Sequence, residues 1–206
     1  MGFILYFGCS FTFGEGVNDD ETIPFYVSQL APEYQPYNYG FRGYGPQQML
    51  AKLQSDEITE EVGHTGRGIA VYTFIDEHVP RVIGSMRALY FVRYHPYYNA
   101  DREDQLIRRG SFTSDRPILT RLYWLISKSQ ILKYFRVDWP RVNENRIRLT
   151  ARIISESCRL FREQFGSNDF YVLIYPGATH YGKQLTPYLE QANIKYLDYS
   201  RLPFEK

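Results

Sequence analysis

Four short runs of mainly apolar and aromatic residues and one more polar run, none with helical spacing, alternate with longer segments of a different pattern. The first run, residues 3–7, is apolar or aromatic at every position, which is typical of a strand buried on both faces of a sheet. Mostly apolar runs also occupy residues 68–75, 170–175 and 194–197, and the more polar residues 35–39 form a further candidate strand. The pattern therefore predicts five strands.

The segments between these runs carry apolar residues three or four positions apart, which is the spacing of one helix face. Residues 47–62 show it, and residues 142–165 continue it as far as Gly166, a residue type that commonly ends helices. Further helices are predicted at residues 23–31, at 182–192, and at 117–135 with a break near 127–129. Strands that alternate with helices favour a parallel sheet with right-handed crossovers. We therefore predict an α/β fold, a three-layer α/β/α sandwich.

The regular alternation is interrupted by an insertion at about residues 88–140. Residues 89–94 and 106–112 have the composition of strands and flank a polar turn at 99–105, which predicts a β-hairpin followed by the helical segment. The aromatic residues at 90–98 fit two interpretations, cross-strand packing or the wall and lid of a ligand cleft. The prediction is thus one domain spanning all 206 residues, with a hairpin and helical insertion.

The charges of the chain nearly cancel. There are 24 basic and 23 acidic residues, giving a net charge of +1, so no overall field attracts nucleic acid. No apolar segment approaches the roughly 20 residues that span a bilayer. Cys9 and Cys158 have neither the spacing of metal ligands nor that of a disulfide framework. We therefore predict no membrane span, no metal and no cofactor.

Both ends of the sequence lie close to predicted strands. Met1 and Gly2 lead directly into the first strand, and the last residues follow the fifth strand with no further helix. No basic stretch followed by an apolar core and a cleavage site precedes the first strand. We expect a domain truncated at both ends, and a leader or anchor before the first strand would make the natural protein exported or anchored. The cellular location is left open.

Candidate chemistry follows from the ends of the predicted strands, because open parallel sheets bind ligands beyond the carboxyl ends of their strands. Polar or glycine-rich loops occur there at residues 8–16, 38–46 and 76–78. Ser10 offers a hydroxyl nucleophile, and Gly43, which has no Cβ, can bring its backbone N–H close to an oxyanion. The alternatives are an N-cap role for Ser10 and an ordinary turn for Gly43.

The sequence resembles the SGNH (GDSL-like) hydrolase family in two blocks. The family's first block is a strand followed by Gly-Asp-Ser and further glycines; residues 8–16 match it, with Cys9 in place of Asp. The second block, Asn-x-x-x-x-Gly, is matched by Asn38 and Gly43. The resemblance implies a flavodoxin-like fold with a five-stranded parallel sheet, Ser10 as the nucleophile and Gly43 in the oxyanion hole.

Two further blocks of the family depart from its pattern. The third block ends on an asparagine that completes the oxyanion hole, whereas this chain has Asp76, whose carboxylate would help only if it were protonated or displaced. The fourth, Asp-x-x-His, is not found, because Asp198 is followed three positions later by Arg201. His78 and His180 are the candidate substitute bases or substrate contacts, and the alternative for both is a structural role.

Three functions are interpretations of this pattern. The first is a serine ester hydrolase or acyltransferase that forms an acyl-Ser10 intermediate with a small-molecule or glycan acyl ester. In it, Arg42 either contacts an anionic group of the substrate or is a solvated surface residue. The second is a noncatalytic ligand-binding module on the same fold, which lacks the base. The third, a nucleotide-binding flavodoxin-like protein, is disfavoured because no P-loop or dinucleotide fingerprint occurs. Substrate, acyl group and oligomeric state are not determined by the sequence.

Overall fold

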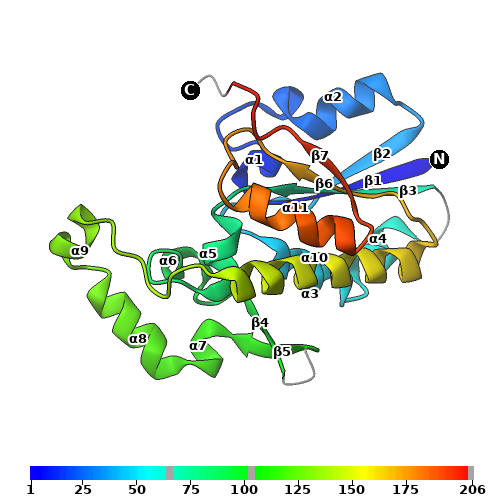
Figure 1. Ribbon diagram of the computed structural model, residues 1–206. Helices are drawn as coiled ribbons and strands as arrows, with labels where there is room; N and C mark the ends of the chain where they lie inside the picture. The colour runs from blue at the N-terminus through cyan, green and yellow to red at the C-terminus, as the bar shows by residue number, and fades with distance from the viewer. Residues whose placement is uncertain (64–66, 102–104, 204–206) are drawn as a thin grey trace.

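A five-stranded parallel sheet runs through the middle of the molecule (Figure 1). The computed structural model describes residues 1–63, 67–101 and 105–203. The strands lie in the order β2-β1-β3-β6-β7, and every neighbouring pair is parallel. Their bounds are β1 (Gly2–Phe7), β2 (Tyr34–Asn38), β3 (Gly68–Phe74), β6 (Phe170–Ile174) and β7 (Lys195–Asp198). The five predicted strands and their parallel arrangement are confirmed.

The strand order reverses beside β1. The chain moves from β1 outward to β2 and then crosses to β3 on the other side of β1, where Leu5 is paired with Ala70. Such a switch point leaves a crevice at the carboxyl ends of the two central strands. The loops that follow Phe7 and Phe74 therefore begin at the edge where this class of fold binds ligands.

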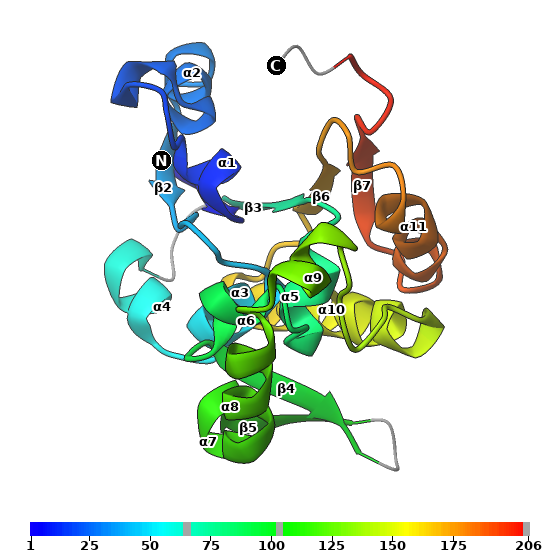
Figure 2. The ribbon, with the colours of Figure 1, turned by 90° about the vertical axis from the view of Figure 1, so that its left-hand side faces the viewer.

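Helices cover both faces of the sheet, which confirms the predicted three-layer arrangement. Figures 1 and 2 show α2 on one face and α3, α10 and α11 on the other. The bounds of the helices outside the insertion are α1 (Ser10–Phe13), η1 (Asp19–Glu21, a 3-10 turn), α2 (Ile23–Leu30), α3 (Pro46–Leu53), α4 (Glu57–Val62), α5 (His78–Ile83), α10 (Glu144–Phe165) and α11 (Tyr181–Gln191). The main core lies between the sheet and α3, α10 and α11.

The long helix α10 matches its prediction because both of its ends are encoded locally. The side chain of Asn143 accepts a hydrogen bond from the N–H of Arg146 at 3.2 Å, and Gly166 ends the helix at a φ of 64°, in the left-handed region. The single helix predicted at 47–62 is instead two, α3 and α4. The hydroxyl of Ser55 donates to the carbonyl of Lys52 at 2.9 Å, and such local side-chain bonding competes with helix continuation.

The insertion contains the predicted hairpin, but its first strand was placed wrongly. The strands are β4 (Pro96–Ala100) and β5 (Leu106–Ser111), which are antiparallel, whereas residues 89–94 begin with a helix, α6 (Leu89–Val92). Leu89 and Val92 are buried while Tyr90 and Phe91 are exposed, a three-residue period rather than strand alternation. The remaining helices of the insertion are α7 (Phe112–Asp115), α8 (Pro117–Ile126) and α9 (Gln130–Tyr134).

The break predicted near 127–129 is confirmed by the separation of α8 from α9. These two helices project from the body of the molecule beyond the end of the sheet at which β1 and β3 finish (Figure 1). Their inner sides pack with α6 and α7 on a second apolar cluster. None of the helices in the described ranges has the length and apolar character needed to cross a membrane.

Candidate active site

Ser10 lies where the sequence pattern placed it, just past the carboxyl end of β1. Gly8 makes the turn at a φ of 155°, and a Cβ there would come within 2.1 Å of the Thr12 hydroxyl oxygen, so the tight path needs glycine. Cys9 has extended backbone, and Ser10 is the first residue of α1. The Ser10 side chain is half-buried, and its hydroxyl forms no hydrogen bond within the described part of the chain. It is thus available to a ligand.

The second loop is joined to the first by Asn38, whose individual role the sequence reasoning did not identify. The side-chain N–H of Asn38 donates to the carbonyl of Thr12 at 3.0 Å, and its oxygen accepts from the N–H of Gly40 at 3.0 Å. A Cβ on Gly40 would lie 2.8 Å from the backbone nitrogen of Phe13. The asparagine and the glycine therefore hold this loop directly against α1. In the sequence, only the spacing of Asn38 and Gly40 could have indicated this contact between the loop and α1.

Gly43 occupies a turn in which the N–H of Tyr44 donates to the carbonyl of Phe41 at 3.0 Å. Its φ of 81° is in the left-handed region, where residues with a Cβ are strained. In the described part of the chain, neither the Gly43 N–H nor the Ser10 N–H donates to a protein acceptor. Backbone N–H groups at buried positions normally have partners, so these two are candidate ligand donors.

Arg42 lies on the outer side of the same turn. Its Nε is 3.5 Å from a carboxylate oxygen of Glu15, and both side chains are largely exposed. The pair connects the first and second loops at the surface, where a screened ion pair contributes little stability. The predicted contact with substrate stays a prediction, since the arginine has a carboxylate partner in this structure.

Asp76 follows β3 and binds the beginning of α11. Its two carboxylate oxygens accept three backbone N–H groups, from His180 at 3.0 Å, Tyr181 at 2.8 Å and Gly182 at 3.0 Å. Carboxylates satisfy helix N-termini well because they pair with unsatisfied N–H groups and with the positive end of the helix dipole. Asp76 thus has a defined structural task, and its predicted part in the oxyanion hole stays a prediction.

The two candidate histidines lie in different environments. His78 is fully buried, its Nδ1 is 2.7 Å from the hydroxyl of Tyr72, and burial holds its pKa well below the ordinary value. His180 is exposed at the start of α11. The rings of Phe11 and Tyr175 pack 4.7 Å apart, which places the residue after Ser10 against the chain that leads to His180. Of this pair, only His180 is open to solvent at the sheet edge.

A third histidine, His95, lies beside the second loop and had no predicted role. Its ring packs edge-on against Tyr44 at 5.7 Å, its Nδ1 is buried without a hydrogen-bond partner, and burial lowers its pKa to about 4. No pattern in the sequence indicates that His95 lies beside the second loop, because His95 belongs to the insertion and contacts Tyr44 only in the folded chain. His64 lies outside the described residues.

Acidification from pH 6.5 towards 4 is expected to lower the free energy of unfolding. His78 and His95 are held neutral in the folded chain, so the unfolded chain, with ordinary histidine pKa values of 6.5, binds more protons in this range. A His95→Gln variant should show a smaller loss than the unchanged protein in urea unfolding at pH 7 and pH 4.5. An equal loss of unfolding free energy in both proteins would show that His95 does not contribute to this pH dependence.

The Asp-x-x-His pair of the family has no equivalent in the described part of the chain. Asp198 ends β7, and its carboxylate accepts the N–H of Ser200 at 2.9 Å. Hydrogen bonding to the side chain and backbone of Ser200 lowers the pKa of Asp198. No histidine of the described residues is hydrogen-bonded to Ser10. Nor do three or more His, Cys, Asp or Glu side chains gather there in an arrangement suited to a metal ion. Among the described residues the geometry supplies a serine hydroxyl and two backbone N–H groups without a protein acceptor.

Comparisons with known proteins identify the fold. Neither a protein-family profile nor a curated protein matches the chain. Among solved structures, a member of the lipolytic G-D-S-L family from Veillonella parvula aligns with a TM-score of 0.50 and 12% identity, covering 96% of this chain and 78% of its own. AlinE4, an SGNH-hydrolase family esterase, gives 0.46 and 11%, covering 96% and 76%. A lipase from a goat rumen metagenome gives 0.47 and 13%, covering 96% and 80%. The predicted resemblance is confirmed at the level of the fold, which is that of the SGNH hydrolases.

Proposed function

We propose that the protein is a serine ester hydrolase of the SGNH type, which cleaves an acyl ester or transfers its acyl group through an acyl-Ser10 intermediate. The observation that carries this proposal is the half-buried Ser10 at the switch point of the sheet, whose hydroxyl has no partner among the described residues, with unpaired N–H groups on Ser10 and Gly43. Two preorganised N–H donors next to a hydroxyl suit the tetrahedral intermediate of acyl transfer. The substrate class is a small-molecule or glycan acyl ester.

In this mechanism the Ser10 oxygen attacks the ester carbonyl carbon, and the negative charge that develops on the carbonyl oxygen is held by the Ser10 and Gly43 N–H groups. The leaving oxygen takes the proton that was removed from the Ser10 hydroxyl and departs as an alcohol, and water or a second alcohol then takes the acyl group from Ser10. Asn38 positions both loops, and Asp76 positions the chain at the start of α11.

The proton of Ser10 needs a base, and His180 is our candidate among the described histidines. It is exposed at the same sheet edge, and the packing of Phe11 on Tyr175 brings its loop beside α1. Hydrogen bonds between catalytic groups are often long without substrate, so the lack of a direct bond to Ser10 does not decide against it. His78 is less suited, because its ring is enclosed by Tyr72 and Phe74.

The proposal is tested by locating the adduct formed with a fluorophosphonate probe, which labels activated serines. We expect one phosphonylated residue in the intact protein, and peptide mapping should assign it to Ser10. Ser200→Ala is the matched control, since Ser200 lies at the same edge of the sheet but is buried, and this variant should be labelled like the unchanged protein. An adduct elsewhere, or none, contradicts the proposal.

A noncatalytic ligand-binding module is the second candidate function. It is favoured by one observation, the absence of a histidine bonded to Ser10 among the described residues. In such a module the two free N–H groups would hold a carboxylate or an ester carbonyl without reaction. This function predicts no fluorophosphonate adduct together with saturable binding of a short-chain carboxylate that Gly43→Val weakens.

A further inference from the structure

The helix α8 is apolar on two sides, but only one of them is covered. Leu119, Tyr123 and Ile126 face the second apolar cluster, and Tyr123 is 5% exposed. On another side Ile118, which is 84% exposed, is followed at helical spacing by Leu122 and Leu125. Helices that are apolar all round are normally enclosed. The uncovered side of α8 therefore calls for a partner that the chain does not supply within the described residues.

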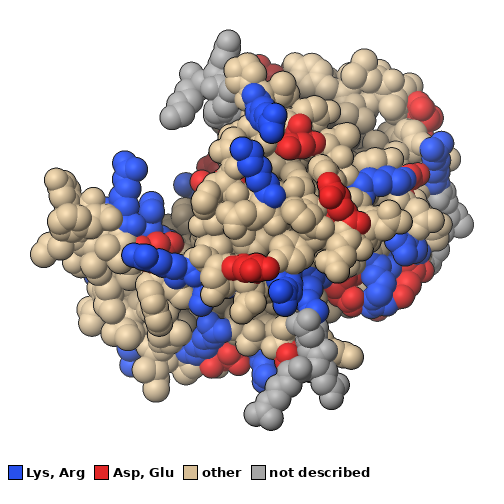
Figure 3. All heavy atoms as spheres, viewed as in Figure 1, with Lys and Arg blue, Asp and Glu red and all other residues tan. Residues whose placement is uncertain are grey.

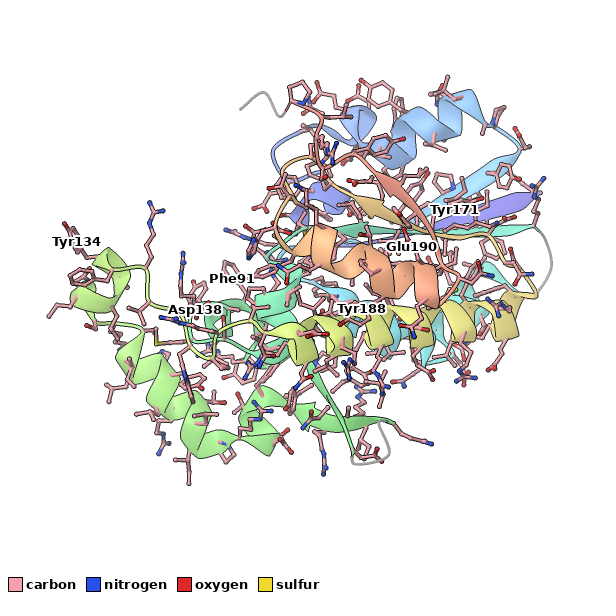
Figure 4. All side chains as sticks on the ribbon, viewed as in Figure 1. Phe91, Tyr134, Asp138, Tyr171, Tyr188 and Glu190 are labelled. Carbon is pink, nitrogen blue, oxygen red and sulfur yellow. The ribbon has the colours of Figure 1, made fainter. Side chains whose placement is uncertain are left out.

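The uncovered surface continues across α9 and the segment behind it. We name residues 117–139 the α8–α9 lobe. Figure 4 shows Tyr134 at the tip of this lobe, pointing away from the body of the molecule. The large apolar side chains exposed on it are Ile118, Leu122, Trp124, Leu125, Ile131, Tyr134, Phe135, Val137 and Trp139. So many in one segment exceed the scattered apolar residues of an ordinary surface and mark an interaction site.

Two shallow grooves lie on the lobe and combine apolar walls with cations. One, of about 820 Å³, is lined by Ile118, Leu122, Trp124 and Leu125 together with Arg93, Arg121 and neighbouring residues. The other, of about 450 Å³, runs between α6, α8 and α9 and includes Leu132, Val137, Lys128 and Lys133 in its lining. The amphipathic character is thus repeated on both sides of α8.

The charge of the lobe differs from that of the rest of the protein. It carries four basic residues, Arg121, Lys128, Lys133 and Arg136, and one acidic residue, so its net charge is +3 while that of the whole chain is +1. None of the four basic side chains forms an ion pair within the described ranges. In Figure 3 the lobe, at the left, is mostly tan with blue side chains beside it.

The single acidic residue of the lobe, Asp138, is occupied in holding the lobe to the body. Its carboxylate accepts the hydroxyl of Ser85 at 2.8 Å and the N–H of Arg87 at 3.0 Å. The N–H of Met86 also donates to the carbonyl of Trp139 at 2.8 Å. The base of the lobe is therefore fixed, and the positive charges on its outer part are not offset by a free carboxylate of the lobe.

We propose that the α8–α9 lobe docks on an anionic lipid bilayer, with its exposed aromatic and aliphatic side chains entering the headgroup region. Tyr and Trp beside Lys and Arg are the combination that binds membrane interfaces, and each lysine or arginine near the surface attracts anionic lipids. Protein–protein interfaces are instead depleted in lysine, so Lys128 and Lys133 favour lipid over a protein partner. The charge complementarity selects anionic headgroups.

Docking would hold the candidate active site at the lipid surface. α6 connects the lobe to the second loop, since a Cβ on Gly43 would lie 3.4 Å from the side chain of Phe91. The lobe projects at the same end of the sheet as the carboxyl ends of β1 and β3. The docking itself does not depend on the proposed chemistry of Ser10, so a Ser10→Ala variant should bind lipid unchanged.

Tryptophan fluorescence reports directly on this contact, because both tryptophans of the chain, Trp124 and Trp139, lie in the lobe and are about half exposed. The experiment titrates the protein with phosphatidylcholine vesicles that contain about 30% phosphatidylserine, and with vesicles of phosphatidylcholine alone. We expect a blue shift of the emission and co-sedimentation with the anionic vesicles only, weakened at least tenfold by 0.5 M NaCl.

Two variants and a control make the test specific. Ile118→Glu with Leu125→Glu removes the apolar contact, and Lys128→Gln with Lys133→Gln removes two charges; each pair should weaken vesicle binding at least tenfold. Leu30→Glu on α2, where Leu30 is as exposed as Ile118, should bind like the unchanged protein. Circular dichroism confirms that each variant is folded.

The proposal is overturned if the protein does not bind the anionic vesicles, or if the Ile118→Glu, Leu125→Glu variant binds them equally well. A dimer in sedimentation velocity that this variant dissociates, with no vesicle binding, would assign the lobe to an interface between two copies and would also overturn it. Failure of Ser10 labelling with intact vesicle binding would reject the proposed function alone.

Discussion

A Ser10→Ala variant is expected to hydrolyse a short-chain aryl ester with kcat/KM lowered by about 10³-fold or more. In the proposed mechanism the alanine removes the oxygen that would form the acyl-enzyme, while the N–H groups of residue 10 and Gly43 would still polarise the carbonyl. Because those donors alone would still accelerate hydrolysis, we expect kcat/KM to fall and not to reach zero. Initial rates measured at several substrate concentrations provide kcat/KM.

The folded state should hardly change in this variant. The Ser10 hydroxyl is half-buried and bonds to no described residue, so its removal leaves no buried group unpaired. Thermal unfolding should therefore show the same Tm within a few degrees, and Ser200→Ala should retain both Tm and activity. If Ser10→Ala kept kcat/KM within threefold of the unchanged protein, the hydrolysis would not pass through Ser10.

The sequence predicted the sheet well because its strands are encoded by local composition. Residues 3–7 and 170–175 contain nothing but apolar and aromatic side chains, and burial on both faces of a parallel sheet demands that pattern. The secondary structure of the insertion was harder to predict. The aromatic residues of 89–94 suit a strand by propensity, yet packing of Leu89 and Val92 on the second cluster selects a helix.

For the candidate site, the sequence predicted the positions of Ser10 and Gly43 in the fold, because both lie in short blocks that follow strand ends. Contacts between distant segments were not predicted. Asp76 is 104 positions before His180, and nothing in the sequence near either residue indicates that one binds the other. In the same way His78 adjoins a strand end in sequence, but the fold turns its ring into the core against Tyr72. Such placements are decided by tertiary packing.

The hydrogen bonds of Asp76 favour a structural role for this residue over a catalytic one. An oxyanion-hole residue would point a donor at the substrate, whereas each oxygen of this carboxylate already accepts from the first turn of α11. Loss of the carboxylate leaves the N–H groups of His180, Tyr181 and Gly182 without their partner. Hydrogen bonds to a charged acceptor are stronger than neutral ones, and an N-terminal cap alone contributes about 1 kcal/mol.

Asp76→Ala is accordingly expected to lower the free energy of unfolding by about 2–3 kcal/mol, measured by urea denaturation at pH 7. Asp76→Asn keeps one oxygen for Tyr181 and Gly182 but turns an N–H₂ towards the N–H of His180, so it should lose about 1 kcal/mol.

The activity of the same Asp76→Asn variant distinguishes a capping role from a role beside the oxyanion. A cap leaves kcat/KM of Asp76→Asn within threefold of the unchanged protein, because the α11 start stays in place. A carboxylate beside the oxyanion would instead repel it, and replacing that charge with an amide donor would raise kcat/KM tenfold or more. A rise of that size, with little change in the free energy of unfolding, would show that Asp76 lies beside the oxyanion and does not act mainly as the cap of α11.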